Sequence, residues 1–233
     1  MEIRFWVVVP AAGSARRMGA AVPKQYLSLA GRTVIEWSLA PFLAHARTAG
    51  IVVALSPGDQ HWAQTTLAGD AKVATTIGGT ERMDSVLAGL RALQDRAAPD
   101  DWVLVHDAAR PCLSATDLDR LLNELQDDAV GGLLAAPVVD TLKRADEDGR
   151  VSQTVARDKL WRALTPQMFR HVVLQRALES AQTNGVAVTD EAQAVEALGL
   201  QPKLVAGDAD NIKITLPEDL PRAERILRSR SAS

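Results

Sequence analysis

The sequence is poor in cysteine, in long apolar runs and in excess positive charge, and each shortage excludes a class of protein. Cys112 is the only cysteine among 233 residues, so no disulfide can form within the chain. No apolar run approaches the roughly 18 residues of a membrane helix, and the first run is too short for a signal peptide. The net charge of −3 argues against a general nucleic-acid binder. These shortages predict a cytoplasmic protein that binds neither membranes nor nucleic acids.

Apolar and β-branched segments alternate with helical patterns along most of the chain. The length and the 47% hydrophobic content predict one α/β domain over residues 1–233 with an appendage. Alternating strands and helices indicate right-handed crossovers and a mostly parallel sheet, with ligands at the carboxyl ends of the strands. The predicted strands are 5–9, 51–55, 72–77, 102–105, 132–136, 202–205 and 212–215. The predicted helices are 33–43, 59–67, 83–93, 114–125, 168–181, 190–198 and 217–228.

The segment 137–161 interrupts this alternation. Residues 141–144 and 151–155 form two short strand patterns, and Asp148-Gly149 between them is a turn signal. The pattern predicts a β-hairpin, which a doubly wound domain cannot easily bury. This hairpin either lies across its own domain or reaches another subunit.

The first strand runs into a loop of very small residues that is followed by cations. Residues 11–15 have almost no side chain, so their backbone N–H groups can approach a ligand closely. Pro10 ends the strand pairing, and Arg16, Arg17 and Lys24 add positive charge. Bare amides and cations at the carboxyl end of a strand suit a polyphosphate. The alternative is an ordinary β-to-α turn with solvated arginines.

Two better-known phosphate loops are excluded at this position. A Walker loop requires Lys-Ser or Lys-Thr, and neither follows Gly19. A dinucleotide fingerprint requires Gly-x-Gly-x-x-Gly, but Gly13 is followed by Ala15 and Arg16.

A second motif, Gly-Gly-Thr-Glu-Arg-Met-Asp-Ser-Val, covers residues 78–86. Gly78 and Gly79 permit a close approach after the predicted strand 72–77. Arg82 and Ser85 fall in the first turn of the next helix, where backbone N–H groups have no helical partner. A glycine turn before an ordinary helix is the alternative.

A third motif, His-Asp-Ala-Ala-Arg-Pro, covers residues 106–111 and directly follows the predicted strand 102–105. Asp107 at this carboxyl end can bind Mg²⁺ or hold a sugar hydroxyl, and Arg110 can bind a phosphate through two hydrogen bonds. The alternative for Asp107 is a helix cap or a loop carboxylate. For His106 we predict a structural role.

The first motif resembles the nucleotidyltransferase signature, Ala-Gly-x-x-x-Arg-Met followed by Pro-Lys. Together the three motifs are most similar to the 2-C-methyl-D-erythritol 4-phosphate cytidylyltransferase family of the non-mevalonate isoprenoid route. The chain departs from the family at Ala15, where a second glycine is usual. The resemblance implies a Rossmann-like three-layer α/β/α nucleotidyltransferase fold with a protruding β-hairpin dimerisation arm at 137–161.

The resemblance also assigns roles to individual residues. It implies that Arg17 and Lys24 stabilise the transition state, and that Arg157 and Lys213 aim the acceptor phosphate. The nucleotide would be held by Pro10, Ala11, Ala12, Gly13, Ser14, Arg17, Lys24, Gly79, Arg82, Ser85, Asp107 and Ala108. The acceptor would be held by Asp107, Arg110, Thr141, Arg157, Thr165, Thr189 and Lys213. Asp107 would bind the Mg²⁺ ion.

The implied activity is attack by the phosphate of 2-C-methyl-D-erythritol 4-phosphate on the α-phosphate of CTP, which releases pyrophosphate. A homodimer formed through the 137–161 arm is implied as well. Two alternatives stay open from the residues alone. One is a cytidylyltransferase with another polyol phosphate, such as ribitol 5-phosphate, as its acceptor. The other is a nucleotide-binding regulator without turnover.

Overall fold

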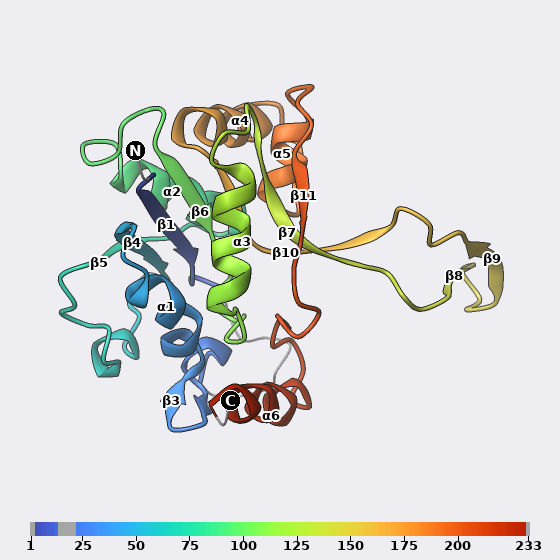
Figure 1. Ribbon diagram of the computed structural model, residues 1–233, viewed down its shortest axis with the longest axis horizontal. Coiled ribbons are helices and arrows are strands. Elements are labelled where there is room, and N and C mark those ends of the chain that lie inside the picture. Colours follow the sequence, from blue (N-terminus) through green and yellow to red (C-terminus); the bar gives the residue numbers. More distant parts are fainter. Residues whose placement is uncertain (1–2, 14–21, 232–233) are drawn as a thin grey trace.

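A seven-stranded sheet forms the centre of the molecule in the computed structural model, which describes residues 3–13 and 22–231 (Figure 1). Its strand order is β11-β7-β10-β6-β1-β4-β5. Its strands are β1 (Phe5–Pro10), β4 (Thr48–Leu55), β5 (Val73–Ile77), β6 (Trp102–Val105), β7 (Gly131–Pro137), β10 (Trp161–Arg170) and β11 (Lys203–Ala206). All neighbours pair in parallel except β10, which is antiparallel to both β6 and β7. The mostly parallel α/β sheet predicted from the alternating pattern is therefore confirmed.

Helices cover both faces of this sheet. They are α1 (Val34–Ala44), α2 (Arg82–Ala92), α3 (Ala115–Leu125), α4 (His171–Thr183), α5 (Glu191–Glu196) and α6 (Asp219–Ser231), with 3₁₀ turns η1 (Lys24–Tyr26) and η2 (Trp62–Gln64). Alternate residues of β1 enter two cores, because strand side chains point to opposite faces. Val7 and Val9 pack with α1 and α3, whereas Val8 packs with α2 and α4. A parallel sheet is buried on both faces in this way, which gives the three layers.

Side chains cap the starts of two predicted helices, α1 and α3. The Thr33 hydroxyl accepts a hydrogen bond from the Glu36 N–H, and the Glu36 carboxylate accepts one from the Thr33 N–H at 2.6 Å. The Ser114 hydroxyl accepts from the Asp117 N–H at 3.1 Å. These bonds satisfy N–H groups that have no partner inside the helix.

Three predicted elements differ from the structure. The helix predicted at 168–181 begins only at His171, because the preceding residues form the end of β10. Pairing with β6 and β7 overrides the helical periodicity there, and the ladder to β7 shifts register between Ala163 and Gln167, around Pro166. The helix predicted at 59–67 is limited to the 3₁₀ turn η2, and the segment 212–215 is not a strand.

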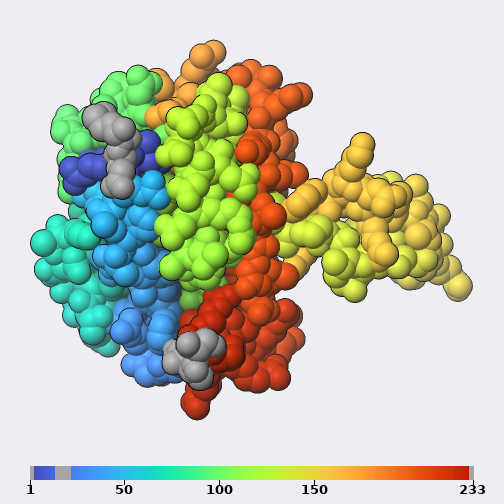
Figure 2. Space-filling view, in the orientation of Figure 1, coloured from blue at the N-terminus to red at the C-terminus, as the bar shows by residue number. Residues whose placement is uncertain are grey.

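The predicted hairpin is present and projects away from the sheet. Strands β8 (Leu142–Ala145) and β9 (Val151–Val155) pair antiparallel to each other in a sheet of their own. The Asp146 carboxylate accepts hydrogen bonds from the Asp148 and Arg150 N–H groups and closes the turn. Both views show the hairpin standing clear of the sheet and its helices, so it does not lie across them (Figures 1 and 2).

A short antiparallel pair, β2 (Ser28–Leu29) with β3 (Arg32–Thr33), precedes α1 and was not predicted. Within the described residues, no helix is long and apolar enough to cross a membrane.

Candidate functional site

The three motifs meet at one cavity beside the carboxyl ends of the parallel strands. β1 and β6 are neighbours in parallel register, with Val8 opposite Val105, so the loops that follow them emerge side by side. The cavity is lined by most of the predicted nucleotide-binding residues: Pro10, Ala11, Ala12, Gly13, Lys24, Gly79, Arg82, Ser85, Asp107 and Ala108. Lys213, predicted to bind the acceptor, also lines it.

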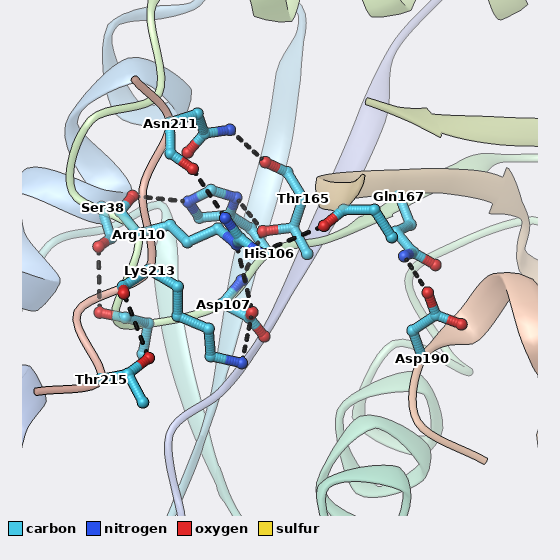
Figure 3. Close-up of polar contacts among 12 residues, drawn as sticks. Ser38, His106, Asp107, Arg110, Thr165, Gln167, Asp190, Asn211, Lys213 and Thr215 are labelled. Carbon is cyan, nitrogen blue, oxygen red and sulfur yellow. Dashed lines mark hydrogen bonds and ion pairs between the residues drawn. The ribbon is translucent and has the colours of Figure 1, made fainter. Parts of the chain in front are cut away.

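Asp107 lies at the centre of a cluster of cations. Its Oδ1 is 3.1 Å from Arg82 Nε, and its Oδ2 is 2.9 Å from Lys213 Nζ and 3.4 Å from Arg110 Nε. Figure 3 shows the lysine and Arg110 converging on this carboxylate. Burial alone would raise the pKa of Asp107, but the three cations outweigh it and hold that pKa well below its usual range. The carboxylate is therefore ionised throughout the physiological pH range.

Arg82 joins this cluster to a second buried carboxylate. Its NH1 and NH2 groups donate to the two oxygens of Glu191 at 2.5 and 3.0 Å. Burial alone would lower the pKa of Arg82, but the charges of Glu191 and Asp107 outweigh it and raise that pKa. The charged guanidinium thus forms part of the cavity wall in a fixed orientation.

Behind Asp107, a buried histidine and threonine hold the third motif in place. The Asp107 N–H donates to the Thr165 hydroxyl at 3.1 Å, and this hydroxyl lies 3.0 Å from His106 Nδ1. The Arg110 carbonyl beside Nε2 can only accept, so Nδ1 of the neutral ring carries no hydrogen and accepts from the Thr165 hydroxyl. The other ring nitrogen, Nε2, then carries a hydrogen and donates to the Arg110 carbonyl at 3.1 Å. This arrangement supports a structural role for His106.

We expect His106 to make the protein less stable as the pH falls below 6.5. Burial lowers the pKa of His106 from 6.5 to about 4. Between these values the unfolded chain binds a proton that the folded chain does not, so acid favours unfolding. Urea unfolding should lose about 2 kcal/mol between pH 7 and pH 5 from this group. The loss of unfolding free energy between these pH values should be smaller by that amount in His106→Gln. Equal losses in wild type and His106→Gln would contradict the prediction.

The glycine motif packs tightly against the first loop. A Cβ at Gly78 would lie 2.7 Å from both the Ala12 Cβ and the Ser85 Oγ, so only glycine fits there without a shift. The Gly79 N–H donates to the Ser85 hydroxyl at 3.2 Å. The second motif therefore brings bare backbone to the cavity, directly beside the first loop.

Lys24 is carried by η1, which is held by contacts to two other segments. The buried Gln25 donates to the Ala11 carbonyl at 2.8 Å, and the Tyr26 hydroxyl donates to Asp59 Oδ2 at 2.9 Å. The Lys24 ammonium donates to the Ile214 carbonyl at 2.8 Å, one residue from Lys213. The η1 turn is thus in contact with both the first loop and the 212–215 segment.

The structure does not bring every predicted residue to the cavity. Ser14 and Arg17, with Arg16, lie outside the described residues. The described lining residues do not include Arg110, Thr141, Arg157, Thr165 or Thr189. Arg110 and Thr165 lie behind Asp107, and Thr189 is exposed beside α5. Thr141 and Arg157 are exposed on the hairpin, where Arg157 donates to the Val139 carbonyl.

Sequence reasoning missed several polar residues around the site. Glu191 binds Arg82, Gln25 binds the first loop, and Asn211 donates to the Thr165 carbonyl at 2.7 Å. The acidic pair at 190–191 in front of a helical pattern was the one visible signal, and it indicates only a helix start. The contacts themselves join positions that are distant in sequence.

A mostly parallel α/β sheet whose carboxyl edge carries a bare-backbone loop, two lysines and an ionised aspartate is typical of a nucleotidyltransferase, and the comparisons with known proteins agree. A family model described as 2-C-methyl-D-erythritol 4-phosphate cytidylyltransferase matches residues 5–229. An enzyme of that name from Pseudomonas aeruginosa (strain UCBPP-PA14) is 59% identical over 222 residues, which are 95% of each chain.

Two solved structures have the same fold. One is described as 4-diphosphocytidyl-2C-methyl-D-erythritol synthase; it has a TM-score of 0.83 and 38% identity, over 97% of this chain and all of that one. The other is 2-C-methyl-D-erythritol 4-phosphate cytidylyltransferase from Francisella tularensis, with a TM-score of 0.83 and 34% identity, over 96% and 99% of the chains. The chain belongs to the 2-C-methyl-D-erythritol 4-phosphate cytidylyltransferase family, a family of transferases in isoprenoid biosynthesis.

Proposed function

We propose that this chain joins CTP and 2-C-methyl-D-erythritol 4-phosphate to give 4-diphosphocytidyl-2-C-methyl-D-erythritol and pyrophosphate. An oxygen of the acceptor phosphate forms a bond to the α-phosphorus of CTP. The bond from that phosphorus to the oxygen that bridges the α- and β-phosphates breaks, and pyrophosphate leaves. No general base is required, because the attacking phosphate is already an anion at neutral pH.

The convergence of the three motifs on one cavity carries this proposal. Bare backbone at 10–13 and at 78–79 suits a triphosphate and a small flat base, respectively. The Lys24 ammonium donates to the Ile214 carbonyl, and the neighbouring Lys213 contacts the Asp107 carboxylate. Lys24 would stabilise charge that develops on the α-phosphate, together with Arg17, and Lys213 would aim the acceptor phosphate.

A divalent ion fits this site only as a partner of the nucleotide. The described residues contain no group of three or more His, Cys, Asp or Glu side chains that could hold a metal. Mg²⁺ takes few carboxylates and keeps several waters, so the CTP phosphates with Asp107 suffice. Bound there, Mg²⁺ would neutralise charge on the leaving pyrophosphate. Because both Asp107 oxygens face cations, we expect its contact with the ion to pass through water.

The remaining acceptor contacts would come from a second subunit. Thr141 and Arg157 are exposed on the projecting hairpin, away from the described cavity of their own chain. Apolar side chains are also exposed near the base of the hairpin, with Val139 at 72% and Leu204 at 44%. A two-fold dimer would cover this surface and would bring each hairpin to the partner's site.

Pyrophosphate release from CTP and Mg²⁺ with a panel of polyol phosphates tests the proposed function. We expect release with 2-C-methyl-D-erythritol 4-phosphate and little release with ribitol 5-phosphate. Faster turnover of ribitol 5-phosphate would show that this compound, and not 2-C-methyl-D-erythritol 4-phosphate, is the acceptor. Binding of CTP without turnover of any acceptor would make the chain a nucleotide-binding regulator.

We expect strong selectivity for CTP over purine nucleotides. Gly78 packs on Ala12 of the first loop and Gly79 packs on Asp84, so this side of the cavity is bare backbone that suits a small base. We therefore expect a purine to be excluded by size. The kcat/KM for CTP should exceed that for ATP by about a hundredfold or more, with UTP as the nearest competitor. Comparable kcat/KM values for CTP and ATP would contradict the role of the second motif.

A further inference from the structure

Glu191 is a buried carboxylate that lies one contact away from the cavity. Its side chain is only 1% exposed, and it occupies the first turn of α5. The N-cap of that helix, Asp190, accepts hydrogen bonds from the Gln193 N–H and from the Gln167 amide, which is on β10. Figure 3 shows the contact between Gln167 and Asp190 that fixes the start of this helix to the sheet, and Glu191 is the next residue.

Two carboxylates together use all three nitrogens of the Arg82 guanidinium. Glu191 accepts from NH1 and NH2, and Asp107 accepts from Nε. The planar guanidinium has its donors in a fixed fork, so these three bonds determine both its place and its plane. α2 carries Arg82, α5 carries Glu191, and the loop after β6 carries Asp107, so the contact joins three elements of the site.

A buried ion pair of this kind needs an explanation other than stability. Removing two charges from water costs about as much as their attraction returns, so such a pair is weak evidence for stabilisation. Arg82 lines the same cavity as the first loop, which suits a triphosphate. A guanidinium that is free to rotate would bind phosphate oxygens, because phosphate is a preferred partner of arginine. The hydrogen bonds to the two carboxylates prevent this rotation.

We propose that Glu191 is a positioning residue that holds Arg82 on the cavity wall beside Gly79, on the side proposed for the base of CTP, and keeps it off the triphosphate. This inference rests on the proposed cytidylyltransferase activity. Glu191 touches neither substrate in this arrangement. Its effect passes through Arg82, so its loss should change nucleotide affinity and base selectivity more than the chemical step.

Steady-state kinetics of Glu191→Gln, Glu191→Asp and the control Glu196→Gln test the inference. Glu196 is on the same helix but exposed. We expect Glu191→Gln to raise the KM for CTP about tenfold, to change kcat less than about twofold and to narrow the preference for CTP over UTP. Glu191→Asp, which keeps the charge, should recover part of the loss. Glu196→Gln should match the wild type.

The same substitution in an Arg82→Ala background separates positioning from a general structural role. If Glu191 acts through Arg82, Glu191→Gln adds no further change in kcat/KM to Arg82→Ala. An equal loss in both backgrounds, an unchanged KM for CTP, or a loss confined to kcat would overturn the inference. Thermal unfolding of each variant identifies a loss that comes from misfolding. Absence of wild-type turnover would instead overturn the proposed function, which the wild-type measurement reports separately.

Discussion

Replacing Lys24 with alanine should reduce kcat by about 10² to 10³-fold, the usual cost of removing a donor to developing transition-state charge. The Lys24 ammonium lies in the cavity between the first loop and the 212–215 segment, 2.8 Å from the Ile214 carbonyl. In the proposed site, the bare backbone of 10–13 would supply ground-state contacts to the nucleotide without this side chain. Interactions that are stronger in the transition state appear in kcat, so the Kd for CTP should change less than about tenfold. Single-turnover kinetics and calorimetry measure the two quantities.

Lys72→Ala is the matched control for this experiment. The Lys72 ammonium also donates to a backbone carbonyl, that of Leu43, but the described cavity does not include it. This variant should retain wild-type kcat. If Lys24→Ala abolishes CTP binding while kcat at saturation survives, Lys24 is a ground-state ligand and the proposed role is wrong. We expect Arg17→Ala to behave as Lys24→Ala does.

Mixing two nearly inactive variants, Lys24→Ala and Arg157→Ala, should restore about a quarter of wild-type activity if each hairpin serves the partner's site. When the two are unfolded and refolded together in equal amounts, half of the dimers contain one chain of each kind. In such a dimer one site carries both defects, and the other combines an intact Lys24 with an intact Arg157. Each variant alone should lose most of its activity, because all of its sites carry the defect. Pyrophosphate release before and after mixing measures the recovery.

A second mixture, Lys24→Ala with Lys213→Ala, is the control. Both lysines line the cavity of their own chain, so every site of a mixed dimer keeps one defect and no recovery is expected. Ultracentrifugation and native mass spectrometry report whether mixed dimers form. If they form and the Arg157 mixture still recovers nothing, Arg157 serves its own chain. A monomeric wild type would overturn the shared site directly.

Much of the local structure could be predicted because its causes lie within a few residues. Thr33 with Glu36 and Ser114 with Asp117 begin helices through hydrogen bonds three residues apart. The turn between β8 and β9 forms because one aspartate side chain, Asp146, accepts from nearby N–H groups and Gly149 adopts a positive φ. Ten of the predicted nucleotide-binding residues line the cavity for a similar reason, since their motifs directly follow predicted strands.

The errors fall where pairing between distant segments decides the structure. β10 contains Pro166 and a helix-like spacing, and it is a strand because β6 and β7 lie on both sides of it. The segment 212–215 was predicted as a strand, but its backbone does not pair with another strand. The Ile214 N–H donates to the Ala109 carbonyl, and the Ile214 carbonyl accepts from the Lys24 ammonium. Neither partner is visible in the periodicity of the segment itself.

The residues with the right chemistry can be identified without the structure: bare loops for phosphates, cations beside them and an aspartate at a strand end. The shared contact of Arg82, Arg110 and Lys213 with the Asp107 carboxylate, and the contact of Glu191 with Arg82, follow only from the folded chain. The tertiary structure also decided that the hairpin projects from the body and not across it. The physical reason is that hydrogen-bonded turns and caps depend on neighbours in the chain. Charge clusters depend on the order of strands in the sheet, which brings together residues more than a hundred positions apart.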